Sequence, residues 1–174
     1  MSQMKELPQV GFSEAAQNFF KKCFQFKGRI RRSEYWWGAL TVAIASAVLS
    51  LIPFVGWVAL IFLAIGGISM LFRRLHDTGR SGWWWGCQTL IGLAAGVLFL
   101  SVIDIHAYMT AAQSQDMTKM IRVLSAGMAG STGIFALLLY LVNGALGIAI
   151  FVFTLLDSKP EDNKYGESTK YVME

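Results

Sequence analysis

Residues 35–72 read YWWGALTVAIASAVLSLIPFVGWVALIFLAIGGISMLF, 38 consecutive positions without a charged side chain. A membrane-spanning helix needs about 20 mostly apolar residues, and the hydrocarbon core that it crosses is about 30 Å thick. A single helix of this stretch would reach roughly 57 Å at about 1.5 Å per residue. We therefore expect two helices, over 36–52 and 57–72. Pro53 and Gly56 mark the break, because proline removes a backbone donor and glycine loosens the chain.

Two further stretches, 83–103 and 123–156, also contain no charged residue. We expect one helix over 83–103 and another over 132–156. None of the four predicted helices has the polar face that a soluble amphipathic helix needs. Charged residues make up 15% of the chain, whereas soluble domains average about 25%. The sequence therefore predicts an all-α integral membrane protein with four transmembrane helices, a domain that covers 13–156.

The basic residues predict the orientation in the membrane. Seven of the 15 precede the first predicted span, three lie between the second and third, three follow the last, and two lie in 104–131. Lysine and arginine accumulate in short cytoplasmic segments. We therefore expect both termini in the cytoplasm, with 104–131 as an extracytoplasmic loop and 157–174 as a cytoplasmic tail. The net charge of +4 suits this orientation and anionic lipid, and no nucleic-acid partner is expected.

Two segments outside the spans show helical spacing of apolar residues. Residues 1–12 are predicted to be irregular, and Ser13 is the predicted N-cap of a helix that runs to about Phe26. Its pattern is typical of an amphipathic helix lying in the headgroup region, although packing on another cytoplasmic segment would explain it too. In the loop, a second amphipathic pattern is formed by Ile105, Met109, Met117, Met120, Ile121, Leu124 and Met128.

Gly92 and Gly96 form a Gly-x-x-x-Gly pattern on the third predicted span. Small residues at this spacing let two helices approach closely. The pattern indicates either packing inside the bundle or a face for homo-oligomer formation.

Three motifs lie on the predicted cytoplasmic side: FKGRIRRSEYWW at 26–37, RRLHDTGRSGWW at 73–84 and NKYG at 163–166. In this order they resemble the YhaH-like family of small bacterial inner-membrane proteins, which is catalogued as a domain of unknown function, DUF805. The resemblance covers about residues 15–168 and implies an inner-membrane location without an established activity. The long loop at 104–131 departs from the shorter family members.

The shared side of the motifs suggests a binding face. Arginine forks match phosphate oxygens in pairs, and the helix that begins near Trp83 would present free backbone N–H groups there. We therefore expect a face that binds anionic lipid headgroups or a partner protein. The candidate residues are Arg29, Arg32, Glu34, Arg73, Arg74, His76, Asp77, Arg80 and Trp83.

The same residues also have a purely structural interpretation. Glu34 and Asp77 would pair with nearby arginines and tie the cytoplasmic ends together, and Gly79 would turn the loop. The sequence leaves both interpretations open.

Other functions find less support in the sequence. His76 beside Asp77 suggests a lipid-modifying enzyme, but catalysis needs a third partner in reach, and no known catalytic motif is present. A small oligomeric transporter or channel is the other alternative, although the spans lack the ionisable groups usual in transporters. Cys23 and Cys87 fit no metal-ligand spacing. We therefore predict a protein that is not an enzyme and needs no metal or cofactor.

Overall fold

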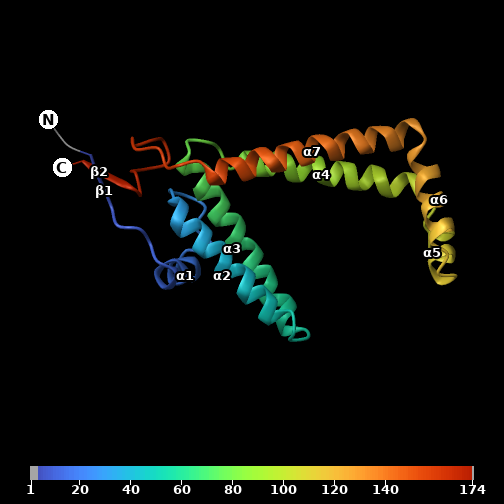
Figure 1. Cartoon of the computed structure of the whole chain (residues 1–174), viewed down its shortest axis with the longest axis horizontal. Helices are drawn as coiled ribbons and strands as arrows, with labels where there is room; N and C mark the ends of the chain where they lie inside the picture. Colours follow the sequence, from blue (N-terminus) through green and yellow to red (C-terminus); the bar gives the residue numbers. More distant parts are fainter. Residues whose placement is uncertain (1–3, 174) are drawn as a thin grey trace. The chain divides into compact units, whose positions relative to one another are not determined.

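The computed structural model describes residues 4–173 and is mainly helical (Figure 1). The chain divides into two compact units, one formed by the residues up to Trp83 together with those from Ile150 onward, and the other by Trp84–Ala149. Each unit is built around one pair of long helices.

In the first unit the long pair consists of α2 (Arg32–Leu49) and α3 (Val55–Asp77), which lie side by side in Figure 1. The turn between them contains Pro53, as expected. Gly56 lies so close to the end of α2 that a Cβ there would collide with the Leu49 carbonyl oxygen. The predicted break is confirmed: α2 ends at Leu49, Pro53 lies in the turn that follows, and Gly56 allows the close approach.

In the second unit the pair consists of α4 (Trp83–Val102) and α7 (Ser131–Leu155), of which Trp83 and the residues from Ile150 onward are counted with the first unit. Asn143 Nδ2 donates to the Gln88 carbonyl oxygen at 2.7 Å. A Cβ on Gly92 would lie 2.6 Å from Asn143 Nδ2, whereas one on Gly96 would have only the Tyr140 hydroxyl near it, at 3.8 Å. Gly92 thus serves packing within this chain, and a homo-oligomer through these glycines stays a prediction.

Within residues 4–173, three helices are long and apolar enough to cross a membrane: α3, α4 and α7. The fourth predicted span falls on α2, which has 18 residues and begins with Arg32, followed by Glu34 in its first turn. These polar residues reduce its apolar length, so the four-span count stays a prediction.

The N-terminal helix α1 (Phe12–Lys21) is shorter than the helix predicted from Ser13 to Phe26. Its N-cap is Gly11, so the prediction of Ser13 as N-cap is wrong. Ala15 and Phe19 are buried, while Phe12 and Phe20 are exposed. Apolar side chains on both faces suit a helix between protein and lipid, and its interfacial position stays a prediction.

The ends of the chain pair with each other, which the sequence analysis did not anticipate. Strands β1 (Met4–Glu6) and β2 (Tyr171–Met173) are antiparallel, with Lys5 opposite Val172. Three-residue strands are too short for a readable alternation of polar and apolar residues. The prediction of an irregular N-terminus over 1–12 is therefore wrong for the strand.

The predicted extracytoplasmic loop is a helical hairpin made of α5 (Ile105–Gln113) and α6 (Met117–Met128). Asp104 caps α5 by accepting from the Ala107 N–H at 2.9 Å, and Asp116 caps α6 by accepting from the Lys119 N–H at 3.1 Å. Aspartate side chains are among the best N-caps. The segment 104–131 is thus an ordered element.

Candidate functional site

Asp77, the last residue of α3, is the centre of a buried ionic cluster. Its Oδ1 accepts from Arg29 Nε at 3.0 Å and its Oδ2 from Arg74 Nη1 at 2.5 Å, and all three side chains have 0% exposure. One carboxylate between two guanidinium groups leaves an excess positive charge inside the protein. Such a cluster is tolerated only when the remaining guanidinium N–H groups also find acceptors.

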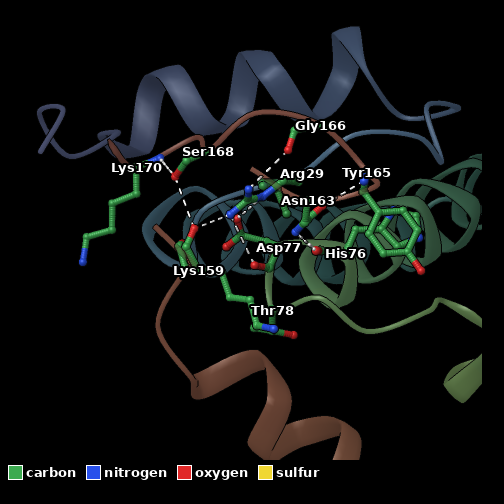
Figure 2. A network of polar contacts seen from close by, with 12 residues as sticks. Arg29, His76, Asp77, Thr78, Lys159, Asn163, Tyr165, Gly166, Ser168 and Lys170 are labelled. Carbon is green, nitrogen blue, oxygen red and sulfur yellow. Dashed lines mark hydrogen bonds and ion pairs between the residues drawn. The ribbon is translucent and has the colours of Figure 1, made fainter. Parts of the chain in front are cut away.

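The other N–H groups of the Arg29 guanidinium donate mainly to the C-terminal tail. It donates to the carbonyl oxygens of Lys159 at 2.5 Å, Glu161 at 2.9 Å and Gly166 at 3.3 Å. Figure 2 shows Arg29 between Asp77 and the carbonyl groups of Lys159 and Gly166. The tail therefore wraps around this one side chain.

The other N–H groups of the Arg74 guanidinium donate to the end of α7 and to the segment before α2. It donates to the carbonyl oxygens of Thr154 at 3.2 Å and Ile30 at 3.3 Å. It also donates to the Leu156 carbonyl oxygen. Carbonyl groups in the last turn of a helix lack intrahelical partners and carry partial negative charge. Arg74 therefore caps α7. The name Asp77 clasp is used below for Asp77, Arg29, Arg74 and the carbonyl groups to which the two arginines donate.

His76 joins the third motif to the other two. Its ring stacks on Tyr165, with centroids 3.8 Å apart and planes at 5°, and its Nδ1 lies 3.1 Å from the Gly28 carbonyl oxygen. Asn163 Nδ2 donates to the His76 carbonyl oxygen at 3.0 Å, as Figure 2 shows. The three sequence motifs thus converge, as their shared side predicted.

The backbone after α3 positions this cluster. The Gly79 N–H bonds the His76 carbonyl at 2.9 Å and the Arg80 N–H bonds the Leu75 carbonyl at 2.8 Å, while Gly79 has a φ of +79°. This is the Schellman arrangement, which favours glycine because other residues rarely adopt such a φ. The glycine of the second motif therefore ends α3 directly after Asp77.

Two further candidates contact neighbouring backbone or side chains of the first unit. Arg73 is buried and donates to the carbonyl oxygens of Ser69 and Lys22, each at 3.4 Å. Glu34 accepts from Asn18 Nδ2 at 3.0 Å. Glu34 thus bonds α1, and its charge also interacts with that of Arg73.

The remaining candidates lie nearer the surface. The Arg80 guanidinium stacks 3.9 Å above the Phe153 ring, and Trp83 is 71% exposed. The Trp83 N–H, expected to be free at the start of α4, donates to Ser81 Oγ at 3.3 Å. Arg32 is exposed and donates to the Leu155 carbonyl oxygen at 3.3 Å. The buried candidates, which contact other groups of the chain, are Arg29, Arg73, Arg74, His76 and Asp77.

A pocket of about 180 Å³ lies at the start of α2 and includes residues that sequence reasoning missed. Lys170 Nζ lies 2.6 Å from Asp157 Oδ2 and 3.6 Å from Glu6 Oε1, and Arg31 Nη2 lies 3.7 Å from the same Glu6 oxygen. Lys170 and Asp157 come from the tail, where no motif marks them. We call this site the α2 pocket; it is lined by Glu6, Gln9, Arg31, Arg32, Ser33, Trp36, Asp157 and Lys170.

The ion pair in the α2 pocket shifts the titration of both partners. The hydrogen bond from Lys170 lowers the pKa of Asp157 below its ordinary value, with help from the Ser158 N–H and the charge of Arg32. The same hydrogen bond raises the pKa of Lys170. Both groups are therefore charged throughout the neutral range.

Acid is expected to release this pair. Because the folded pKa of Asp157 is lowered, its stabilisation is present above the unfolded value of about 3.9 and is lost as the pH falls through the folded pKa. Lys170 stays protonated at acidic pH, so the proton that breaks the pair is taken up by Asp157. The loss should not exceed about 1 kcal/mol, because the carboxylate is half exposed. Denaturant midpoints of wild type and Asp157→Asn across acidic pH measure it.

In that experiment wild type should lose stability on acidification relative to Asp157→Asn. The matched control is Glu167→Gln, which removes another exposed acid of the tail and should keep the acid-dependent loss. Parallel curves for wild type and Asp157→Asn would contradict the assignment.

Long apolar helices joined by a buried ionic cluster define a helical membrane protein. The chain belongs to the family described as "Protein of unknown function (DUF805)", whose family model matches residues 23–167. The resemblance drawn from the three motifs is therefore confirmed.

Two curated relatives come from Escherichia coli strain K12. Inner membrane protein YhaI is 37% identical over 67 residues, which cover 34% of this chain and 57% of the relative. Inner membrane protein YhaH is 42% identical over 71 residues, which cover 34% of this chain and 59% of the relative. The match thus spans less than two thirds of either relative. No solved structure matches the chain.

Proposed function

We propose that this chain is a non-enzymatic protein of the bacterial inner membrane that binds anionic phospholipid headgroups in the α2 pocket. It spans the membrane four times and has both termini in the cytoplasm. The relatives named as inner membrane proteins support the location, and the uneven distribution of lysine and arginine supports the orientation.

The surface of α2 supports its role as the fourth span. Leu40, Ile44 and Val48 are exposed and follow one another at four-residue spacing, so they form one apolar row along the helix. Lipid is the environment in which such a row is stable. The α2 pocket then lies where α2 enters the membrane from the cytoplasm.

The charges of the α2 pocket carry the proposal. Three basic side chains, Arg31, Arg32 and Lys170, face two carboxylates, Glu6 and Asp157. Three basic side chains against two carboxylates leave one positive charge in excess, and Arg32 is the exposed one of the two arginines. This excess of one positive charge matches a single phosphodiester anion, and a guanidinium is well shaped to bind one.

The start of α2 adds donors to that charge. Its N-cap residue makes no side-chain capping bond, and the N-terminal N–H groups of a helix favour anions. Within residues 4–173, the Ser33 hydroxyl is buried and has no hydrogen-bond partner, although it lines the pocket. Trp36 stands beside it, and indole rings prefer the membrane–water interface.

The contacts of other polar residues favour binding over catalysis or transport. The Asp77 carboxylate is directed to Arg29 and Arg74, so it does not orient the His76 ring as a general base would require. The Asn143 side chain donates to the Gln88 backbone carbonyl oxygen. These residues thus have internal uses that need no substrate.

Native mass spectrometry of the protein released from bacterial membranes tests the proposal. Wild type is expected to retain an anionic phospholipid, and the double variant Arg32→Gln with Lys170→Gln is expected to lose about tenfold or more of it, since each charge-assisted hydrogen bond contributes about 1.5–3 kcal/mol. Equal retention of this lipid by wild type and the variant would sink the proposal.

The control for charge alone is the double variant Lys27→Gln with Lys164→Gln. It removes two exposed lysines of the first unit that do not line the α2 pocket, and it should keep the lipid. An equal loss in both double variants would mean general attraction to the membrane surface, not a defined site.

A further inference from the structure

The α5–α6 hairpin is fixed to the ends of α4 and α7 by close backbone contacts. A Cβ on Gly127 would lie 2.5 Å from the Val102 carbonyl oxygen at the end of α4, and a Cβ on Gly133 would lie 2.6 Å from the Gly127 carbonyl oxygen. Such distances admit only glycine. Short connections join the hairpin to both long helices, and it runs across their ends in Figure 1. Since α4 and α7 are long and apolar enough to cross a membrane, the hairpin is held at a bilayer surface.

One side of α6 is apolar and uncovered. Met117 and Ile121 are 65% and 58% exposed, and Leu124 and Met128 continue the row at spacings of three and four residues, which is one helix face. Gly127 is three residues from Leu124 and therefore neighbours this row. The apolar row thus lies toward the side on which α6 contacts the end of α4.

The other side of the hairpin carries its basic side chains. A groove of about 490 Å³ there is lined by Lys119 and Arg122 of α6 and by His106 and Thr110 of α5, together with Ser114 and the small or apolar residues Ala107, Ala111 and Val123. On α5, Ile105 and Met109 are exposed and four residues apart, so this helix too has an apolar row beside its polar one. Both helices of the hairpin are therefore amphipathic.

We infer that the α5–α6 hairpin lies in the headgroup layer of the leaflet at this end of α4 and α7, with its apolar rows in lipid and its basic groove facing water. An amphipathic helix in this position buries its apolar face about 5–10 Å into the headgroup and acyl boundary. Lipid is the occupant because the hairpin is fixed to the ends of two helices that are long and apolar enough to cross a membrane. The inference does not depend on the α2 pocket, which lies in the other unit.

Cysteine variants in a Cys23→Ser, Cys87→Ser chain test this placement. Adjacent residues on opposite faces make matched pairs: Ile121→Cys with Arg122→Cys on α6, and Met109→Cys with Thr110→Cys on α5. Each is labelled with an environment-sensitive fluorophore in nanodiscs that contain lipids with a nitroxide near the headgroup. We expect blue-shifted emission at 121 and 109, with quenching at least about twofold stronger than at 122 and 110, because only the apolar face enters the lipid.

Two results would overturn the inference. Water-like emission at 121 and 109 would place the apolar rows in solvent. Blue-shifted emission without quenching by lipid nitroxides would mean that protein covers them, either a second copy or another partner. Met117→Cys gives a second reading of the α6 row if the 121 variant does not fold.

Discussion

Asp77→Asn is expected to lower the free energy of unfolding by about 3–5 kcal/mol, the usual cost of removing one partner from a buried ion pair. The substitution keeps the size of the side chain but leaves Arg29 and Arg74 charged and buried with no counter-ion at Oδ1 or Oδ2. Water cannot compensate them, because all three side chains have 0% exposure. Denaturant unfolding of the protein in detergent micelles or nanodiscs measures the loss.

The control for Asp77→Asn is Glu14→Gln, which neutralises an exposed acid on α1. Its free energy of unfolding should stay within about 0.5 kcal/mol of that of wild type, as is usual for surface substitutions. An Asp77→Asn protein as stable as the control would mean that the clasp does not hold the fold together.

Gly92→Ala is expected to cost about 1–3 kcal/mol, the usual range for overpacking. The new methyl group would lie 2.6 Å from Asn143 Nδ2, so the Asn143 side chain must move and give up its bond to the Gln88 carbonyl. Gly96→Ala places the same methyl group one turn further along α4, where the nearest atom is 3.8 Å away. It should therefore cost no more than about 0.5 kcal/mol.

The comparison of these two variants also addresses the Gly-x-x-x-Gly pattern. Apparent stability and the mass of the detergent-solubilised particle are measured for both. Equal destabilisation at Gly92 and Gly96, with loss of a larger particle, would instead favour the homo-oligomer face. A loss confined to Gly92 supports packing between α4 and α7.

The long helices could be predicted because their information is local. Uncharged runs of the right length mark α3, α4 and α7, and Pro53 with Gly56 marks the turn before α3. The family motifs also indicated which segments come together. The helix starts were less predictable: Ser13 is a good N-cap type, yet Gly11 takes that position, since any residue whose backbone is extended can precede a helix.

The contacts of the arginines could not be predicted from the local sequence. A row of arginines on one side of a membrane predicts an anion site equally well whether the side chains point outward or inward. Most of the groups that hold Arg29 and Arg74 inward are backbone carbonyls of the tail and of α7, and every residue has a carbonyl. The sequence therefore shows the donors but not their acceptors. Lys170 was missed for a related reason, because its partner Asp157 is close only after the tail folds back.

The clasp and the α2 pocket are physically linked. Arg29 holds the tail through the carbonyls of Lys159 and Gly166, and Lys170 follows four residues later on that tail. Arg32 follows Arg29 closely in the N-terminal segment. The buried arginine thus brings together the two segments that supply the basic side chains of the pocket, and the structural and binding interpretations of the motifs become parts of one arrangement.

Hydrogen–deuterium exchange of the tail tests the clasp most directly. Several tail N–H groups are donors in the folded tail, including those of Lys159 to the Asp77 carbonyl at 3.3 Å and Gly166 to the Asn163 carbonyl at 2.9 Å. In nanodiscs, peptides covering 157–170 should exchange slowly in wild type and fast in Asp77→Asn, while peptides from the middle of α4 and α7 exchange alike in both. Tail peptides that exchange in wild type as fast as an unfolded chain would contradict the account.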